Sequence, residues 1–392
     1  MELELSAAQR TFRDDLRSYL ADLMTPALVA EVATDLEGGG PEFRAAMRRM
    51  GRDGMLGHSW PARFGGRDSS AVEQFLFADE VQAVGFPLPF LTLNTVGPVL
   101  MEYGTEEQQQ HFCPRILAGE LFFAIGYSEP DAGTDLAALT TRAVRDGDEW
   151  VITGQKMWTS MANYADYVWL AARTDPDVDK HAGLSIFLVP TSADGYSFQR
   201  VQTVGGVTTN ATFYDDVRVP ADHLIGGENR GWALIVGQLN RERISLMTVG
   251  RTLRLLRDVT AWAQDTPMDG RAVIDAPSVR LNLARIHAKA QALRLMNWKQ
   301  AWAADRGRPD MAESSAIKVF GSEFNLEAAR ALLEVLGTVG LLDAASPGAV
   351  LEGRALSAYL NGMILTFGGG TNEVQRDIIA MAGLGLPHYK EA

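Results

Sequence analysis

The stretch FAIGYSEPDAGTD, residues Phe123–Asp135, marks the point where the sequence changes from a helical to a β-rich pattern. Two glycines and one proline restrict the path of its backbone. Gly133 lets the backbone approach a ligand closely, and the hydroxyls of Ser128 and Thr134 can donate to an anion or a heteroaromatic ring. Taken alone, the stretch is better explained as a polar turn that closes one domain onto the next.

Short β-rich runs follow this stretch, namely WVITG, YVWLAAR, LSIFLVP, YSFQRVQ and ATFYDDVRV. Turn-forming residues separate them, including DGD at 146–148 and SADG at 192–195. Runs of this length between such turns are typical of strands in a compact barrel or sandwich. We therefore expect a middle β domain over residues 122–226.

Helical periodicity lies on both sides of the β region. Phe12, Leu16 and Leu20 recur every four residues, which predicts a helical domain over residues 1–121. After Gly226-Gly227 a helical period returns in four long segments, at 231–264, 276–305, 312–337 and 348–366. These segments predict a four-helix bundle over residues 227–392. The expected fold class is α+β multidomain, in the order helical domain, β barrel or sandwich, helical bundle.

Composition excludes several classes of function. The 392 residues are 46% hydrophobic and 22% charged, with a net charge of −13, which disfavours nucleic acid and anionic membrane as partners. Cys113 is the only cysteine, and no Cys/His cluster is spaced to hold a metal. The first residues have no signal pattern, and no run of about 18 apolar residues could span a bilayer. We expect a cytoplasmic protein without a metal site.

A second polar stretch lies inside the β region, GQKMWTSMAN at residues 154–163. Here Trp158 stands beside the hydroxyls of Thr159 and Ser160. A large aromatic side chain next to two hydroxyls can pack on a flat ring and hydrogen-bond its edge. The alternative is an ordinary tryptophan of the core.

Four motifs, SEPDAGTD, KMWTS, YDDVRVP and GGGTNEVQR, occur in this order across nearly the whole chain. In order and spacing they resemble the acyl-CoA dehydrogenases, in particular the actinobacterial members that degrade lipids or sterols. The resemblance implies a helical, a β and a four-helix domain with FAD and an acyl-CoA between them, in a tetramer. It also implies dehydrogenation to the 2,3-enoyl-CoA, with transfer of the electrons to an electron-transfer flavoprotein.

The resemblance assigns roles to individual residues. Tyr127 and Ser128 look like the pair that contacts the flavin ring, and Trp158 with Thr159 and Ser160 looks like the segment near N5. Further positions that it implies for the cofactor are Gly133, Thr134, Thr371 and Glu373. For the acyl-CoA it implies Thr134, Arg243, Gly369 and Gly370.

The proton acceptor departs from the common pattern of the family. Many members have a glutamate two residues before the threonine of the last motif, where this chain has Gly369. Other members place it on the first long helix of the C-terminal bundle, and Glu242 in LNRER matches that position. Glu242 also falls within an apolar stripe formed by Trp232, Ile235, Leu239, Leu246, Val249, Leu253 and Leu256.

A carboxylate on the inward face of a helix is costly to bury without a partner. Glu242 is therefore either paired with a neighbouring arginine or held with a raised pKa, ready to take a proton. The resemblance favours the second interpretation. The glycines Gly368–Gly370 can simply end a helix, or they can leave room for a bulky or branched acyl group.

A second departure concerns the far end of the cofactor. Many relatives carry Arg-x-x-Phe-Gly between the first two bundle helices, reaching the FAD diphosphate of a neighbouring subunit. This chain has DTPMDGR at Asp265–Arg271, where Arg271 could replace that arginine or be merely solvated. Two alternatives stay open: a partner subunit of a heteromeric dehydrogenase with an incomplete flavin site, or a flavin oxidase or monooxygenase on the same scaffold.

Overall fold

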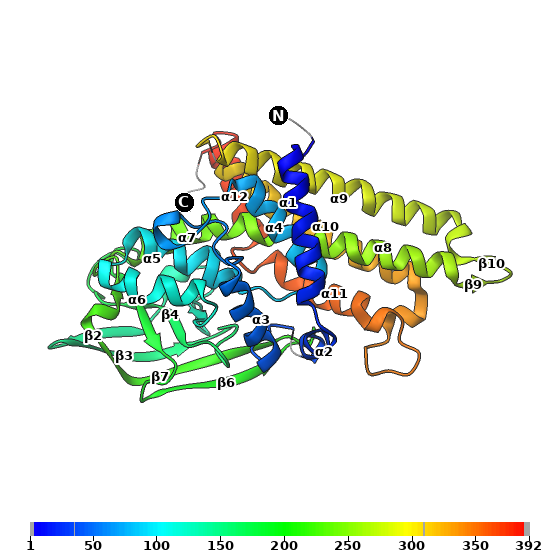
Figure 1. Ribbon diagram of the computed structural model, residues 1–392. Helices are drawn as coiled ribbons and strands as arrows, with labels where there is room; N and C mark the ends of the chain where they lie inside the picture. The colour runs from blue at the N-terminus through cyan, green and yellow to red at the C-terminus, as the bar shows by residue number, and fades with distance from the viewer. Residues whose placement is uncertain (1–3, 35, 309, 388–392) are drawn as a thin grey trace.

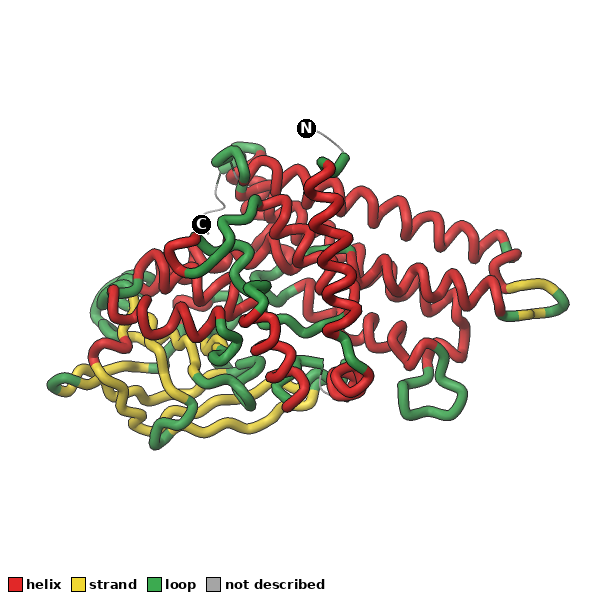
Figure 2. The backbone as a smooth tube through the Cα atoms, in the orientation of Figure 1, coloured by secondary structure: helices red, strands yellow, loops and turns green. Residues whose placement is uncertain are grey.

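The computed structural model describes residues 4–34, 36–308 and 310–387, apart from the side chains of residues 239–246. Figure 1 shows a β-sheet at one end of the molecule and long helices at the other, with the N-terminal helices beside both. Figure 2 shows almost all of the strands gathered at one end, apart from one short hairpin at the opposite end, and the colours of Figure 1 show that the strands of the sheet come from the middle of the chain. The predicted α–β–α arrangement is therefore confirmed.

The N-terminal part is helical, as predicted. Its helices are α1 (Ala7–Leu23), α2 (Pro26–Thr34), α3 (Pro41–Arg52), α4 (Ala71–Val84), α5 (Gly97–Tyr103) and α6 (Glu106–Leu117). Capping boxes begin three of them, at Ser6, Ser70 and Thr105, where each side chain accepts from the third backbone N–H of its helix. The periodic residues Leu16 and Leu20 are 1% and 0% exposed, so the predicted face of α1 is the one that packs inward.

The middle part forms one mixed sheet of eight strands. Its strands are β1 (Phe123–Gly126), β2 (Arg142–Asp146), β3 (Glu149–Lys156), β4 (Tyr167–Arg173), β5 (Leu184–Pro190), β6 (Tyr196–Gln202), β7 (Thr208–Pro220) and β8 (Leu224–Ile225). Their order is β6-β7-β3-β2-β4-β5-β8, with β1 parallel to β4. Only Arg142 and Arg173 pair β2 with β4, so the sheet is nearly divided into two halves.

The two halves of the sheet face each other across a shared core. Trp150 of β3 and Phe187 of β5 are buried there, with ring centroids 5.2 Å apart. Alternate residues of β4 and β5, such as Trp169 and Ile186, point the other way into the core of the N-terminal helices. This is the packing of a sandwich, and it fixes β1 and β4 between two cores.

The C-terminal part is helical again. Its elements are α7 (Gly231–Leu246), α8 (Gly250–Asp265), the short strands β9 (Pro267–Met268) and β10 (Arg271–Ala272), α9 (Pro277–Ala304), α10 (Met311–Leu336), α11 (Arg354–Gly362) and α12 (Asn372–Ile378). The proposed domain limits at 121/122 and 226/227 fall in the loops before β1 and before α7. None of the helices described has both the length and the apolar content of a bilayer span.

The predicted helix 231–264 is wrong as one element, because the chain breaks between α7 and α8. Asp79 of α4 causes the new start: its carboxylate accepts from the N–H groups of Val249 at 2.9 Å and Gly250 at 2.7 Å. Such a carboxylate satisfies backbone donors that a helix start leaves unpaired. The apolar stripe from Trp232 to Leu256 therefore spans two helices and does not lie along one face.

The last predicted helix, 348–366, is also shorter than expected. Leu351, Glu352 and Gly353 have φ values of 51°, 56° and 66°, which are incompatible with a right-handed helix. The regular helix α11 begins only at Arg354 and ends at Gly362. The bundle thus keeps long helices at α8, α9 and α10 and a short one at α11.

Candidate active site

The first two motifs lie side by side at one end of the sheet. The SEPDAGTD motif follows β1, and the KMWTS motif follows β3. The backbone N–H of Met157 donates to the carbonyl of Ser128 at 2.8 Å, which joins the two turns directly. Residues about 30 positions apart in the sequence therefore form one polar surface, as a shared ligand site requires.

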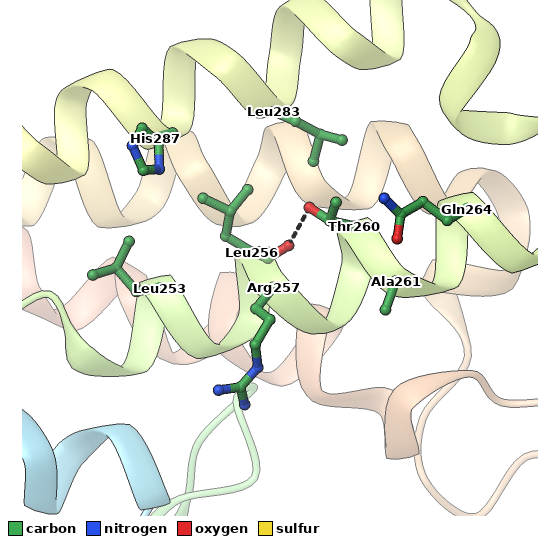
Figure 3. Close-up of a pocket in the computed structure, with 8 residues that line it drawn as sticks. All are labelled: Leu253, Leu256, Arg257, Thr260, Ala261, Gln264, Leu283 and His287. Carbon is green, nitrogen blue, oxygen red and sulfur yellow. Dashed lines mark hydrogen bonds between the residues drawn. The ribbon is translucent and has the colours of Figure 1, made fainter. Parts of the chain in front are cut away.

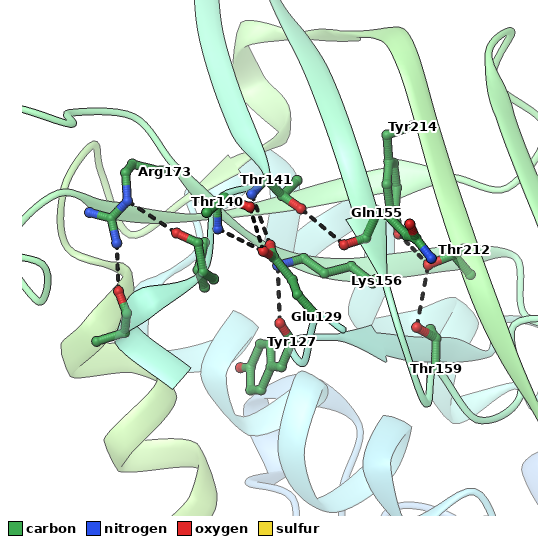
Figure 4. Close-up of polar contacts among 12 residues, drawn as sticks. Tyr127, Glu129, Thr140, Thr141, Gln155, Lys156, Thr159, Arg173, Thr212 and Tyr214 are labelled. Carbon is green, nitrogen blue, oxygen red and sulfur yellow. Dashed lines mark hydrogen bonds and ion pairs between the residues drawn. The ribbon is translucent and has the colours of Figure 1, made fainter. Parts of the chain in front are cut away.

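A buried ion pair locks this junction (Figure 4). Lys156 is 0% exposed, and its Nζ donates to Glu129 Oε1 at 2.8 Å and to the carbonyl of Tyr127 at 3.0 Å. Glu129 also accepts from the backbone N–H groups of Thr140 at 2.7 Å and Thr141 at 2.8 Å. The carboxylate of Glu129 thus joins three chain segments: its own turn after β1, the end of β3 at Lys156, and residues 140–141.

The protonation of this pair follows from its surroundings. Burial opposes ionisation of Glu129, but the charge of Lys156 and the hydrogen bonds outweigh it and lower the pKa of Glu129 to about 2. Burial also lowers the pKa of Lys156 below its ordinary value, against the pull of Glu129. Both groups are charged at neutral pH, and the pair acts as a rigid support.

The KMWTS turn holds its tryptophan outward. Trp158 has a φ of 63° and is 58% exposed, so the alternative of a core tryptophan is wrong. Thr159 is buried, and its N–H donates to the carbonyl of Asn210 at 2.8 Å. The hydroxyl of Ser160 lies 3.2 Å from that of Thr209. A tryptophan whose backbone adopts the left-handed region is strained, and backbone strain of this kind is typical of ligand sites.

The SEPDAGTD turn shows an open and a closed part. Gly133 and Thr134 are exposed, and a Cβ on Gly133 would meet no atom within 4 Å. The ring of Tyr127 is buried instead: its hydroxyl accepts from Trp169 Nε1 at 3.1 Å and donates to the side-chain oxygen of Gln238. The Tyr127 side chain therefore fixes the turn from the core side, while Gly133 leaves space for a ligand.

Gln238 ties this turn to the C-terminal part, because it lies on α7 and is 0% exposed. Position 242 follows it by four residues, which is about one helical turn on the same face. The side chains of Glu242 and Arg243 lie outside the described residues. The prediction of Glu242 as proton acceptor and the prediction for Arg243 therefore stay predictions.

The last motif forms a loop between α11 and α12. Gly369 and Gly370 have φ values of 70° and 97°, a region that strongly favours glycine. Thr371 caps α12, since its hydroxyl accepts from the N–H of Val374 at 3.2 Å, and Glu373 is exposed in the first turn. The backbone conformation of this loop thus requires glycine, independently of any space that the glycines leave for an acyl group.

One buried side chain, that of Gln375, lies beneath this loop. Gln375 is 0% exposed, and neither end of its amide has a hydrogen-bond partner among the residues that the structure describes. A Cβ on Gly370 would lie 2.7 Å from Gln375 Nε2, so the amide sits directly against the loop. A buried amide without partners costs free energy unless a ligand or water satisfies it.

Two other regions contain none of the motif residues. A groove of about 410 Å³ between α8 and α9 is lined by Leu253, Leu256, Arg257, Thr260, Ala261, Gln264, Leu283 and His287 (Figure 3). The hairpin β9–β10 turns at Asp269 and Gly270, whose φ values are 51° and 80°, and it presents an exposed Arg271. Within the described ranges no group of His, Cys, Asp and Glu could hold a metal ion.

Sequence reasoning missed three residues that shape the site, Glu129, Lys156 and Gln375. Glu129 and Lys156 belong to the quoted motifs, and their opposite charges beside apolar strands could have suggested a buried pair. Gln375 also stood in a quoted motif, but nothing in the sequence distinguishes it from an exposed polar residue of a short helix. Its burial depends on the packing of α12 against α10.

Comparison with known proteins covers the whole length of the chain. Residues 6–120, 124–217 and 229–384 match the family models of the N-terminal, middle and C-terminal domains of acyl-CoA dehydrogenase. The acyl-CoA dehydrogenase FadE26 of Mycobacterium tuberculosis is 51% identical over 99% of both chains, and FadE29 of the same organism is 45% identical over 99% of both.

Two solved structures resemble the chain closely. A chain of the ChsE4-ChsE5 complex from Mycobacterium tuberculosis has a TM-score of 0.93 and 51% identity, covering 99% of this chain and 100% of that one. A chain of the Tcur3481-Tcur3483 steroid ACAD has a TM-score of 0.92 and 48% identity, with 99% and 100% covered. The first of these structures is described as a complex of ChsE4 and ChsE5, and the name of the second joins two proteins, Tcur3481 and Tcur3483.

Proposed function

Because the chain belongs to the acyl-CoA dehydrogenase family, we propose that Glu242 takes the α-proton of an acyl-CoA thioester whose β-hydride passes to FAD. The family resemblance of the four motifs is confirmed. The chain is an oxidoreductase that acts on acyl-CoA, and its cofactor is FAD. The identity of the proton acceptor, the acyl group and the partners are proposals, argued below.

The residues at the junction fit a flavin. The exposed indole of Trp158 offers a flat apolar face, and the open side of Gly133 allows close approach of a ligand. The amide of Gln375, buried without a partner among the described residues, suits a site that gains polar contacts when the cofactor binds. When bound, FAD supplies the acceptor for the hydride.

One observation carries the assignment of Glu242: α7 is hydrogen-bonded through Gln238 to Tyr127, in the turn that also carries Ser128. Position 242 lies one helical turn further along the same face of α7. The α-proton of a thioester is weakly acidic, so its removal requires a carboxylate within hydrogen-bonding reach. Main-chain N–H groups of the glycine loop, at Gly369, would stabilise the developing enolate oxygen.

We propose a bulky acyl group, of the steroid class, as the substrate. The glycines Gly368–Gly370 present no side chain where many relatives carry a glutamate. A similar enzyme, the Tcur3481-Tcur3483 steroid ACAD, is 48% identical to this chain. A site wall of glycines leaves more volume for a ring system than one with a carboxylate side chain.

We also propose that the functional assembly is a heterotetramer with a related chain, which passes its electrons to an electron-transfer flavoprotein. The hairpin β9–β10 offers only Arg271 where relatives carry the diphosphate-binding Arg-x-x-Phe-Gly. A second kind of chain could supply the missing contact. A similar chain, 51% identical to this one, occurs in the ChsE4-ChsE5 complex. A homo-oligomer is the competing outcome.

The experiment compares the chain purified alone with the chain co-purified with a related dehydrogenase chain. Both preparations are examined by visible absorption and then titrated without oxygen with straight-chain, branched and steroid acyl-CoAs. We expect flavin absorbance in the heteromer and its bleaching by the steroid thioester at the lowest concentration. Absence of bleaching by every thioester would contradict the proposed function, and full activity of the chain alone would contradict the heteromer.

A further inference from the structure

A second buried lysine lies under the glycine loop of the last motif. Lys318 of α10 is 0% exposed. Its Nζ donates to the carbonyl of Gly370 at 2.6 Å, to Asn372 Oδ1 at 2.8 Å and to the carbonyl of Thr366 at 3.3 Å. The lysine therefore contacts the chain both before and after the three glycines.

This arrangement answers a problem that the glycines create. Glycine loses more backbone entropy on ordering than any other residue, and a run of three would sample many conformations. Gly369 and Gly370 adopt the left-handed region, with φ values of 70° and 97°. Because an ammonium has three N–H donors, Lys318 can hold the carbonyls at both ends of the loop at once.

The support continues along α10. Ser322 follows Lys318 by four residues and lies on the same face of the helix. Asn372 Nδ2 donates to the hydroxyl of Ser322 at 3.0 Å, and Asn372 Oδ1 accepts from Lys318. The same helix packs against α7, and a Cβ on Gly321 would lie 2.9 Å from Met247 Cβ, just beyond the end of α7. One helix thus carries both the loop and the helix of Glu242.

Burial of a charged amine costs several kcal/mol, so a lysine that contacts a loop in this way needs a reason beyond packing. Its charge polarises the peptide group of Gly370 and Thr371, since it binds that group's carbonyl at 2.6 Å. Lys318 therefore fixes the shape of the loop that carries the Gly369 N–H proposed to bind the thioester oxygen.

We propose that Lys318 is a positioning residue for dehydrogenation, which holds residues 366–372 in the conformation that receives the thioester carbonyl and the flavin. This inference rests on the proposed function. Lys318 contacts main-chain carbonyls and Asn372, so the role that we assign to it is positioning and not chemistry on the reacting atoms. It acts through the main chain of the loop, because its hydrogen bonds limit the conformations that the three glycines would otherwise allow.

The test compares the assembled holoenzyme with the variants Lys318→Met and Lys299→Met. Methionine keeps a long unbranched side chain but has no donors, and Lys299 is an exposed lysine of α9 paired with Glu313. Each protein is measured for thermal unfolding, FAD content, KM, and the rate of flavin reduction by saturating acyl-CoA without oxygen. The flavin spectrum with bound 2,3-enoyl-CoA reports how strongly the loop polarises the carbonyl.

We expect Lys318→Met to reduce its flavin about 100-fold more slowly, the loss typical of a misplaced reacting group, while KM changes little. Its enoyl-CoA complex should lose most of the spectral shift, and Lys299→Met should match the wild type. If Lys318→Met does not fold, Ser322→Ala, which loosens Asn372 alone, should still slow reduction several-fold. Wild-type rates and spectra in Lys318→Met, or in Ser322→Ala where Lys318→Met does not fold, would overturn the role of Lys318. Failure of acyl-CoA to reduce the flavin of the wild type would instead overturn the proposed function.

Discussion

Lys156 and Lys318 are both fully buried, yet the two regions that they hold differ. Lys156 lies against a carboxylate, Glu129, which is itself bound by two backbone N–H groups of the next turn. Lys318 binds main-chain carbonyls and the amide oxygen of Asn372, in a loop next to Gln375, whose amide has no hydrogen-bond partner among the described residues. The carboxylate of Glu129 thus has its partners within the protein, whereas the amide of Gln375 has polar capacity left for a ligand.

This difference has a consequence for folding and binding. A buried ion pair within one sheet is strongly destabilising to break by removing one partner, and it fixes the turns before any ligand arrives. The support of the glycine loop governs its geometry, on which the chemistry depends. Breaking the ion pair should therefore appear mainly in unfolding, and loosening the support of the loop mainly in flavin reduction.

The largest expected effect on stability comes from breaking the ion pair on the β side. Lys156→Met leaves Glu129 charged and buried, and removal of one partner of such a pair costs about 3–5 kcal/mol. Urea unfolding measures this loss. The matched control is Lys180→Met, because Lys180 and Asp135 form an exposed pair at 2.7 Å whose loss costs about 1 kcal/mol or less. Equal losses in the two variants would contradict the comparison.

The same pair predicts how stability depends on pH. The pKa of Glu129 falls from 4.5 to about 2 on folding, so between these values the unfolded chain binds a proton that the folded chain does not. The free energy of unfolding contributed by Glu129 is complete above pH 4.5 and is lost as the pH falls towards 2. Urea unfolding at several acidic pH values should show a smaller slope in the double variant Glu129→Gln/Lys156→Met than in the wild type. Identical slopes would remove Glu129 from the account.

A pair of glycine variants sharpens the comparison with a smaller effect. Gly370→Ala forces a Cβ onto a φ of 97° and within 2.7 Å of Gln375 Nε2, which we expect to cost about 1–3 kcal/mol. Gly133→Ala adds a Cβ in open space and should change stability by about 0.5 kcal/mol or less, but weaken FAD binding. Thermal unfolding and flavin titration separate the two effects. The account is wrong if Gly133→Ala unfolds as easily as Gly370→Ala.

The sequence was sufficient for the architecture because its β-rich runs and long helical segments match the observed elements. The quoted β-rich runs lie in β3 to β7, and the predicted helices 276–305 and 312–337 correspond to α9 and α10. The break between α7 and α8 could not be predicted, since it is caused by Asp79, about 170 residues earlier. A tertiary contact of this kind leaves no local trace in the sequence.

The site was predictable only as far as the motifs reach. They located the two turns at Ser128 and Trp158, which the structure joins through Met157. They did not distinguish residues that pack beneath the site from residues that are open to a ligand. Tyr127 and Thr159 are buried, whereas Gly133 and Trp158 are exposed. Which way a residue points depends on the core that forms beneath it.

The most direct test of the account is flavin reduction by acyl-CoA in the variant Glu242→Gln, measured without oxygen in the assembled holoenzyme. Glu228→Gln, which changes an exposed glutamate just before α7, is the control. The account predicts that Glu242→Gln keeps its FAD and its affinity for the thioester but reduces the flavin about 1,000-fold more slowly, because no carboxylate takes the α-proton. Reduction at the wild-type rate would show that the proton acceptor lies elsewhere.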